Sequence, residues 1–225
     1  MGKFIVIDGL DGSGKETQSK LLKSRLEAAG HRVRMISFPM YESESSRLVR
    51  MYLGGELGEH PEDTNAYAAS SFFASDRYVS YVTDWKKDID DPATAVIANR
   101  FTTANAVHQL SKMPREKWDE FLDWLWDHEY EKLGVPRPDL VIYLEMTPEI
   151  SMSLVSRRSE QTGREKDIHE LDPKHLENSY AAAVYSSDKL GWSRICCYEG
   201  NEPLSIEEIS RKVSETVNKK LGINI

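Results

Sequence analysis

Short runs of apolar and β-branched residues recur along the chain, and the segments between them carry apolar residues at helical spacing. This alternation of strand-like and helix-like segments is typical of βαβ units, in which helices cover both faces of a parallel sheet. The pattern therefore predicts an α/β protein with three layers, α/β/α, built around a five-stranded parallel sheet. The predicted strands span residues 4–8, 33–38, 94–99, 139–145 and 193–199.

Several of the predicted helices carry clear sequence signals. The first spans about residues 15–29 and is followed by Gly30, a residue that readily ends a helix. Another, at about 113–134, is rich in aromatic residues, which predicts core packing with part of the helix at a subunit interface, where aromatic residues are enriched. A third, at about 148–158, leads into a basic stretch.

The first predicted strand runs directly into a glycine-rich segment that matches the phosphate-binding pattern G-x-x-x-x-G-K from Gly9 to Lys15. Glycines allow consecutive backbone N–H groups to surround an anion, and the helix that begins there directs its positive dipole end at the same anion. Lys15 can then reach the outer phosphates, which predicts a P-loop NTPase fold. The residues predicted to contact the nucleotide are Gly9, Leu10, Asp11, Gly12, Ser13, Gly14, Lys15, Glu16 and Thr17.

Composition and charge narrow the class of protein. Residues 1–225 are expected to form a single domain of ordinary globular composition, 40% hydrophobic and 29% charged. A net charge of −8 disfavours a nucleic acid polymer as partner, because the chain has no general basic field. No apolar run approaches the roughly 20 residues of a membrane span. The N-terminus enters a core strand without a signal peptide, and Cys196 and Cys197 are expected to be reduced, so we expect a cytoplasmic protein with no membrane association.

Two polar stretches, residues 40–64 and about 157–172, are too long to be simple connections and are expected to act as lids or binding loops. The second contains Arg157, Arg158 and Arg164, which can meet the charge that develops on a transferred phosphoryl group. The alternative is that some of these arginines only form surface ion pairs. The guanine-reading motif of GTPases is absent and the chain is short for a motor ATPase, so a small-molecule phosphotransferase with a basic lid is favoured.

Short motifs extend in order over nearly the whole chain: the glycine segment with Asp11, Phe38-Pro39, the pair Phe73 and Arg77, Asn99-Arg100-Phe101 and the Pro-Asp-Leu strand at 138–144. In this order and spacing they resemble the thymidylate kinase family. The resemblance implies transfer of the γ-phosphoryl group of ATP to dTMP with Mg²⁺, in a homodimer. Because Gly12 stands where some family members carry Arg, it also implies that the lid supplies arginines for an in-line transfer. The catalytic residues implied are Lys15, Arg100, Arg157, Arg158 and Arg164.

The resemblance also assigns an acceptor site. Phe73 would lie on the thymine ring and Arg77, on the same helix face, would donate to a base carbonyl, although Phe73 also suits core packing. Asn105 would recognise the amide edge of thymine, while Asp11 and Arg100 would hold the sugar hydroxyl and the phosphate. The residues implied to bind dTMP are Asp11, Phe38, Pro39, Tyr41, Phe73, Arg77, Arg100, Asn105 and His108.

Two positions depart from the family pattern at the expected metal site. Glu16 replaces the Ser or Thr that usually follows the lysine, and Asn99 replaces the acidic residue at the end of the strand. We hypothesise that the changes compensate, because Glu16 brings a carboxylate to the Mg²⁺ site from which Asn99 removes one. The competing interpretations are a kinase for another deoxynucleoside monophosphate and a catalytically impaired nucleotide-binding protein. An Arg is also missing after Phe-Pro, so the acceptor phosphate falls to Arg47, Arg100 or both.

Overall fold

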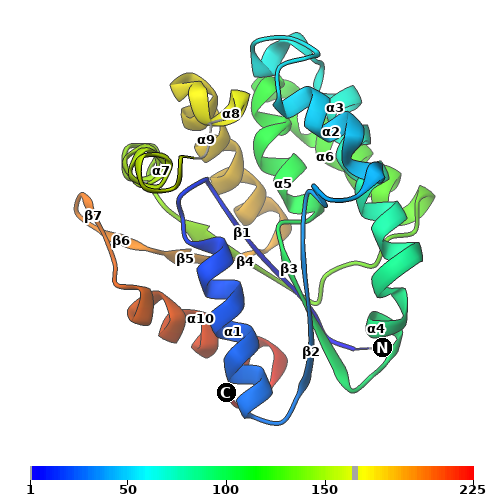
Figure 1. Cartoon of the computed structure of the whole chain (residues 1–225), viewed down its shortest axis with the longest axis vertical. Coiled ribbons are helices and arrows are strands. Elements are labelled where there is room, and N and C mark those ends of the chain that lie inside the picture. Colours follow the sequence, from blue (N-terminus) through cyan, green and yellow to red (C-terminus); the bar gives the residue numbers. More distant parts are fainter. Residues whose placement is uncertain (1, 164–166) are drawn as a thin grey trace.

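A twisted sheet forms the centre of the protein (Figure 1). The computed structural model describes residues 2–163 and 167–225. The strands of the main sheet are β1 (Phe4–Gly9), β2 (Arg32–Ser37), β3 (Thr94–Asn99), β4 (Leu140–Glu145) and β5 (Ser193–Cys196). They are all parallel and lie in the order β2-β3-β1-β4-β5, which confirms the predicted five-stranded parallel sheet.

Strand β1 is buried along its whole length at the centre of the sheet. Ile5 and Ile7 point to one face, where they pack with Leu22, whereas Phe4 and Val6 point to the opposite face. Successive residues of a strand alternate between faces, so a strand that is covered on both sides needs a continuous apolar run. This is why the first apolar run of the sequence predicts a central strand.

Helices cover both faces of the sheet and form the outer two of the three layers. The α-helices are α1 (Lys15–Ala28), α2 (Arg47–Leu53), α3 (Ala66–Ser80), α4 (Lys86–Asp90), α5 (Thr102–His108), α6 (Trp118–Trp126), α7 (Pro148–Thr162), α8 (Ile168–Leu171), α9 (Pro173–Leu190) and α10 (Ile206–Leu221). Helices α1 and α10 pack together on one face, and α3, α5, α6 and α9 lie on the other (Figure 1). None of the described helices is long and apolar enough to cross a membrane.

The last strand is shorter than the sequence predicts. β5 ends at Cys196 rather than at residue 199, and the chain then forms a small antiparallel hairpin of β6 (Tyr198–Glu199) and β7 (Glu202–Pro203). The turn between these strands places Gly200 at a φ of 58°, a conformation that glycine adopts without steric cost. The hairpin therefore interrupts a run of strand-forming residues that continues in the sequence.

The aromatic segment predicted as one helix over 113–134 is helical from residue 115 to 132 and changes helix type along its length. Pro114, which lacks a backbone N–H, separates the 3-10 turns η4 (Leu110–Lys112) and η5 (Arg115–Lys117), and α6 continues as a π-helix, η6 (Asp127–Lys132). Phe121 and Leu125 are fully buried. The prediction of core packing is confirmed, and the buried face of this helix belongs to the interior of the chain.

The polar stretch 40–64 is largely helical rather than an open loop. The 3-10 turns η1 (Glu44–Ser46) and η2 (Pro61–Asp63) lie on either side of α2. Arg50 donates a hydrogen bond of 2.6 Å to the backbone oxygen of Tyr41, and Asp76 of α3 accepts one of 2.6 Å from Ser45. These bonds hold the segment that follows Phe38-Pro39 against α3.

Helix α7 extends beyond residue 158, where the sequence predicts its end. Thr147 caps its first turn through a hydrogen bond from the backbone N–H of Ile150, and Gly163 ends it with a φ of 67°. Arg157 and Arg158 therefore lie on a helix and not on a loop. Arg164 lies outside the described residues.

Candidate active site

A polar cleft of about 540 Å³ opens at the carboxyl ends of β1 and β3, the edge at which parallel α/β sheets bind their ligands. It is bounded by the glycine segment, the start of α1 and one side of α7. Three other residues of the glycine segment, Gly9, Leu10 and Ser13, are buried. The predicted nucleotide-binding and catalytic residues that line the cleft are Asp11, Gly12, Gly14, Lys15, Glu16, Thr17, Arg100 and Arg158.

The conformation of the loop depends on glycine at two positions. Gly12 and Gly14 have φ values of 83° and 84°, in the left-handed region. At Gly12 a Cβ atom would lie 2.9 Å from the backbone oxygen of Ser151 and 3.2 Å from Cβ of Leu154, because α7 packs directly against the loop. A side chain at position 12 has no room, so an arginine at this edge of the cleft has to come from another element.

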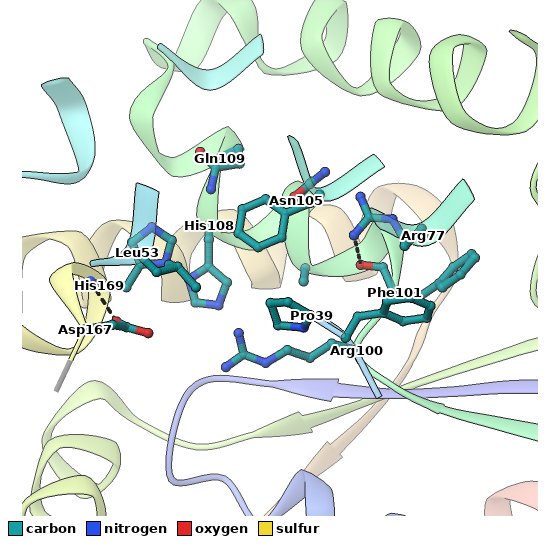
Figure 2. Close-up of a pocket in the computed structure, with 13 residues that line it drawn as sticks. Pro39, Leu53, Arg77, Arg100, Phe101, Asn105, His108, Gln109, Asp167 and His169 are labelled. Carbon is teal, nitrogen blue, oxygen red and sulfur yellow. Dashed lines mark hydrogen bonds between the residues drawn. The ribbon is translucent and has the colours of Figure 1, made fainter. Parts of the chain in front are cut away.

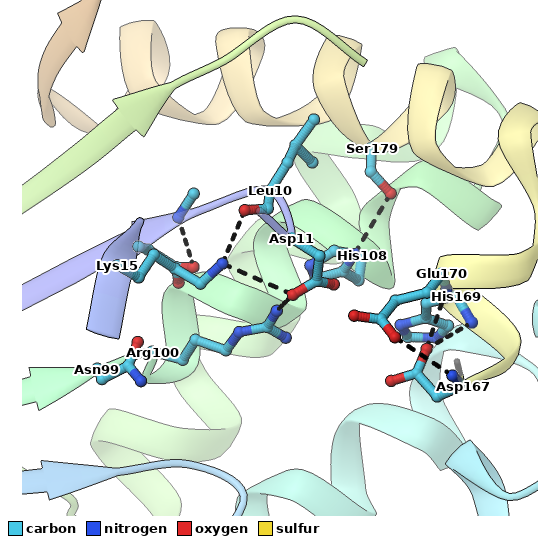
Figure 3. Close-up of polar contacts among 12 residues, drawn as sticks. Leu10, Asp11, Lys15, Asn99, Arg100, His108, Asp167, His169, Glu170 and Ser179 are labelled. Carbon is cyan, nitrogen blue, oxygen red and sulfur yellow. Dashed lines mark hydrogen bonds and ion pairs between the residues drawn. The ribbon is translucent and has the colours of Figure 1, made fainter. Parts of the chain in front are cut away.

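Asp11 lies between two cations at the floor of the cleft (Figure 3). Arg100 Nη2 donates to Asp11 Oδ1, while Lys15 Nζ lies 3.7 Å from the same oxygen and donates to the backbone oxygen of Leu10 at 2.8 Å. Burial by itself raises the pKa of Asp11, but the charges of Arg100 and Lys15 outweigh it and hold the pKa well below its usual range. Burial and the charge of Arg100 lower the pKa of Lys15 to about 8, although Asp11 counteracts them.

The backbone of Arg100 is held in an unusual conformation. Its φ is 65°, and it is the one non-glycine residue with a positive φ among those described. Such a conformation costs about 1–3 kcal/mol and persists where the surrounding structure enforces it; here the N–H of Arg100 donates to Ile7 of β1 at 3.0 Å. Arg47, the alternative holder of the acceptor phosphate, is exposed on α2 and does not line the cleft.

A smaller pocket adjoins the cleft beyond Arg100 (Figure 2). Four residues line both spaces, namely Phe38, Pro39, Arg100 and Asp167, whereas Asp11 and Tyr41 line only the cleft. The pocket holds about 20 Å³, close to the room that one water molecule needs, so a nucleotide base enters only after the surrounding side chains move. The predicted acceptor-binding residues that line the pocket are Phe38, Pro39, Phe73, Arg77, Arg100, Asn105 and His108.

The guanidinium of Arg77 is engaged at the base of this pocket. Its Nε and Nη2 donate to the two carboxylate oxygens of Glu129 at 2.7 and 2.5 Å, and its Nη1 donates to the backbone oxygen of Phe101 at 3.4 Å. Thr102 and Asn105 also donate to Glu129. Arg77 and Glu129 are 1% and 0% exposed, so this is a buried ion pair. The sequence does not indicate Glu129, because a single Glu in an aromatic helix has no recognisable motif.

Helices α7 and α8 bring further charges to the mouth of the cleft. Arg158 forms an ion pair of 2.5 Å with Glu170, and Asp167 and Glu170 together cap the first turn of α8. Burial, with the nearby charge of Asp11, raises the pKa of Asp167 to about 6. The sequence Asp-Ile-His-Glu at 167–170 is the signal that could have predicted this short helix. Arg157 instead lines a separate hollow beside the β6–β7 hairpin.

Oxygen atoms suited to a divalent cation lie at the β3 side of the cleft. Asn99 donates through Nδ2 to Ser37 at 3.0 Å, whereas its buried Oδ1 has no hydrogen-bond partner within the described chain. Mg²⁺ takes oxygen ligands and retains several waters, so the amide oxygen of Asn99 and the hydroxyl of Thr17, two residues that line the cleft, are of the type that a hydrated cation accepts. Glu16 lines the same cleft, and its carboxylate forms an exposed ion pair of 2.6 Å with Lys20.

Comparison with known proteins gives a consistent result. The sequence profile of a family described as thymidylate kinase matches residues 7–188. A thymidylate kinase from Mycobacterium tuberculosis is 28% identical over 193 residues, which cover 84% of this chain and 87% of the relative. A probable thymidylate kinase from Thermococcus gammatolerans is 32% identical over 224 residues, or 98% of both chains. A solved thymidylate kinase structure from Candida albicans shares the fold, with a TM-score of 0.70 and 18% identity over 100% of this chain and 96% of that one.

Replacing Glu129 by Gln is expected to lower the free energy of unfolding by about 3–5 kcal/mol, because Arg77 then keeps a buried charge with no carboxylate to balance it. Glu131→Gln is the matched control. Glu131 is 58% exposed and pairs with Arg137 at the surface, so its loss is expected to cost about 0.5 kcal/mol or less. Urea unfolding measures both values, and equal stability of the two variants would contradict the assignment of Glu129 as the counter-charge.

Proposed function

The chain belongs to the thymidylate kinase family, whose members are ATP-dependent nucleoside monophosphate kinases, and we propose that it transfers the γ-phosphoryl group of ATP to dTMP, giving dTDP and ADP. The observation that carries this proposal is the place of Arg100, which lines both the polar cleft and the smaller pocket. A cation between two cavities can contact a phosphate from either side and stabilise the charge that develops during transfer.

The polar cleft would receive the triphosphate of ATP. The glycine segment and the N-terminus of α1 present backbone N–H groups to an anion. Lys15 has the Leu10 backbone oxygen and Asp11 as its partners, and the outer phosphates would take their place. The hollow between α7 and the β6–β7 hairpin, lined by Arg157 and Pro203, adjoins this side and would accommodate the adenosine.

The smaller pocket would receive dTMP after it opens. Phe73 would stack on the thymine ring, and Asn105 and Arg77 would hydrogen-bond to its polar edge, with Arg77 fixed in place by Glu129. Asp167, the N-cap of α8, and His169 in its first turn close one side of the pocket, so we assign the opening motion to this helix. Closure over both substrates then excludes water as a competing acceptor.

The transfer itself requires alignment and charge stabilisation more than covalent help from the protein. An oxygen of the acceptor phosphate attacks the γ-phosphorus, and the bond from that phosphorus to the β–γ bridging oxygen breaks, so that its electron pair leaves with ADP. Lys15, Arg100 and Arg158 would surround the transferred group, with Arg158 reaching it from α7 after release from Glu170.

The family requires a divalent metal, and we propose that this protein uses Mg²⁺. Asn99 and Thr17 would hold the hydrated ion, and Glu16 would join them after leaving Lys20. When bound, Mg²⁺ supplies positive charge to the β- and γ-phosphates.

We propose that residues 1–225 act as one catalytic domain and that two copies pair through α3. Tyr78, Val79 and Val82 are 39%, 39% and 44% exposed on α3 and on its π-helical extension, η3 (Tyr81–Trp85), and Tyr78 and Val82 share one face. Sedimentation tests this assignment: Val82→Glu should dissociate the dimer, and a monomeric wild type would refute it.

The free thiols of Cys196 and Cys197 are compatible with the cytoplasmic location that we also propose.

A coupled assay with ATP and a panel of nucleoside monophosphates tests the reaction. We expect phosphorylation of dTMP at least about tenfold faster than of dUMP, dCMP or dGMP. Cytosine and guanine leave groups placed to hydrogen-bond to thymine unpaired, whereas uracil has the same polar edge and lacks only the 5-methyl group that a close-fitting pocket would contact. Preference for another monophosphate would establish a different deoxynucleotide kinase. Nucleotide binding without transfer to any acceptor would indicate an impaired, purely binding protein.

The two described arginines of α7 are expected to differ in effect. Arg158→Ala should lower kcat by about 10³-fold, the lower end of the effect of an arginine that stabilises transferred phosphoryl charge, because Arg158 lines the cleft. Arg157→Ala should instead raise KM for ATP and change kcat by less than about tenfold, because Arg157 lies beside the hairpin. Steady-state kinetics with varied ATP separates these effects, and the reverse order would contradict the assignment.

Glu16→Ala tests whether Glu16 compensates for Asn99 at the metal site. We expect the Mg²⁺ concentration for half-maximal activity to rise about 10–100-fold, because one carboxylate ligand is lost. Lys20→Ala serves as the control, since it removes the ion-pair partner of Glu16 but leaves the carboxylate in place. Unchanged activity and Mg²⁺ dependence in Glu16→Ala would refute the compensation.

A further inference from the structure

Three of the six histidines of the chain gather in one buried cluster. His108 ends α5, His169 lies in α8 and His175 lies in the first turn of α9, and each is at most 3% exposed. Their ring centroids are 4.4–5.8 Å apart. One nitrogen of each residue lies within 4.8 Å of a nitrogen of the other two. Three helices thus bring metal-ligating side chains to a single point.

The surroundings of the cluster leave ring nitrogens without partners. The hydroxyl of Tyr52 is 2.8 Å from His169 Nε2, and Ser179 Oγ lies 3.5 Å from His108 Nδ1 and 3.4 Å from His175 Nε2. Figure 3 shows the contact between Ser179 and His108. The opposite nitrogens, His108 Nε2 and His175 Nδ1, have no hydrogen-bond partner among the described residues. Buried polar atoms are rarely left unpaired, so this pair of nitrogens calls for a ligand.

The three rings are held in the neutral form that binds metals. Burial lowers the pKa of each histidine below its ordinary value, and neighbouring positive charges lower it further; the pKa of His175 falls to about 4. Lys112 is one of these charges, but its Nζ donates to the backbone oxygens of Pro61 and Thr64. A neutral imidazole offers a nitrogen lone pair to a metal ion, so the convergence of the three rings is what suggests a ligand.

We propose that His108, His169 and His175 bind one divalent transition metal ion, for which Zn²⁺ is the best match. Three imidazoles without a carboxylate favour Zn²⁺ and chemically similar ions over Mg²⁺ and Ca²⁺, which take oxygen ligands. Zn–N bonds of about 2.0–2.1 Å place the ligand nitrogens of a tetrahedral site about 3.3 Å apart, so the rings rotate inward on binding. Tyr52 and Ser179 supply the hydrogen bonds that typically orient metal-bound histidines.

The position of the cluster gives this metal a structural consequence. His175 does not line the acceptor pocket, but His108 and His169 do. His169 is also adjacent to Glu170, the partner of Arg158. A bound metal ties α8 to α5 and α9, and it therefore restrains the helix to which the opening of the pocket is assigned above. The metal site itself stands independently of the proposed kinase reaction.

Titration of the whole chain, freed of metal with a chelator, tests the proposal directly. Excess Mg²⁺ is added first to saturate oxygen sites, and Co²⁺ is then titrated as a spectroscopic probe, followed by Zn²⁺ in a calorimeter. We expect one equivalent of each ion per chain and the intense visible absorption of tetrahedral, nitrogen-bound Co²⁺. The wild-type protein alone can refute the proposal, either by failing to bind Zn²⁺ or by giving the weak spectrum of octahedral Co²⁺.

His175→Gln is the informative variant, and His31→Gln is its control, since His31 is exposed. His175→Gln should bind Zn²⁺ more than about a hundredfold more weakly, while His31→Gln keeps wild-type affinity. This loss exceeds the roughly 10–100-fold loss that is typical when a residue hydrogen-bonded to a metal ligand is mutated. Zn²⁺ should also slow amide exchange in α8 of the wild type but not of His175→Gln. Wild-type affinity in His175→Gln would refute the ligand set, and unchanged exchange in the wild type would refute the link to α8.

Discussion

The site depends on the carboxylate of Asp11, because it holds two cations from different parts of the chain, one buried and one partly buried. Lys15 comes from the first turn of α1 and Arg100 from the end of β3, and both face the same oxygen of Asp11. Taking these charges out of water is costly, and their mutual attraction offsets the cost. The result is a pair of positive groups fixed near the loop, ready to exchange a carboxylate for phosphate. The backbone of Arg100 has a positive φ at this position and donates to Ile7 of β1.

The second fixed element is the ion pair between Arg77 and Glu129, which joins α3 to the end of the aromatic helix beneath the acceptor pocket. Because two nitrogens of Arg77 are held by Glu129, the group that faces the pocket has little freedom. The opposite wall is α8, a helix of one turn that is bound through Glu170 to Arg158 of α7. The pocket therefore lies between a floor fixed by a buried ion pair and a wall of one helical turn, which packs through Ile168 and His169.

Features that depend on neighbouring residues agree with the structure, whereas the ends of some elements differ from their predicted positions. The glycine segment, the strands at 4–8 and 94–99 and the first helix follow from periodicity and from residues next to one another. The strand predicted at 193–199 extends past the end of β5 at Cys196, because strand-forming residues continue into β6, whereas the helix predicted at 113–134 closely matches the helical residues 115–132. Helix α7 is longer than predicted, because its last turns are polar and no apolar periodicity marks them as helix.

The order of residues along the chain is sufficient to determine the parallel sheet, the phosphate loop and the family resemblance, because each depends on short segments whose conformation is set by neighbouring side chains. Tertiary structure alone decided that Glu129 balances Arg77, that α7 leaves no space at Gly12 and that three histidines converge. These contacts join residues that lie up to 139 positions apart, between Gly12 and Ser151, so no local pattern encodes them. They arise only when helices from separate parts of the chain pack on the same face of the sheet and bury their polar groups together.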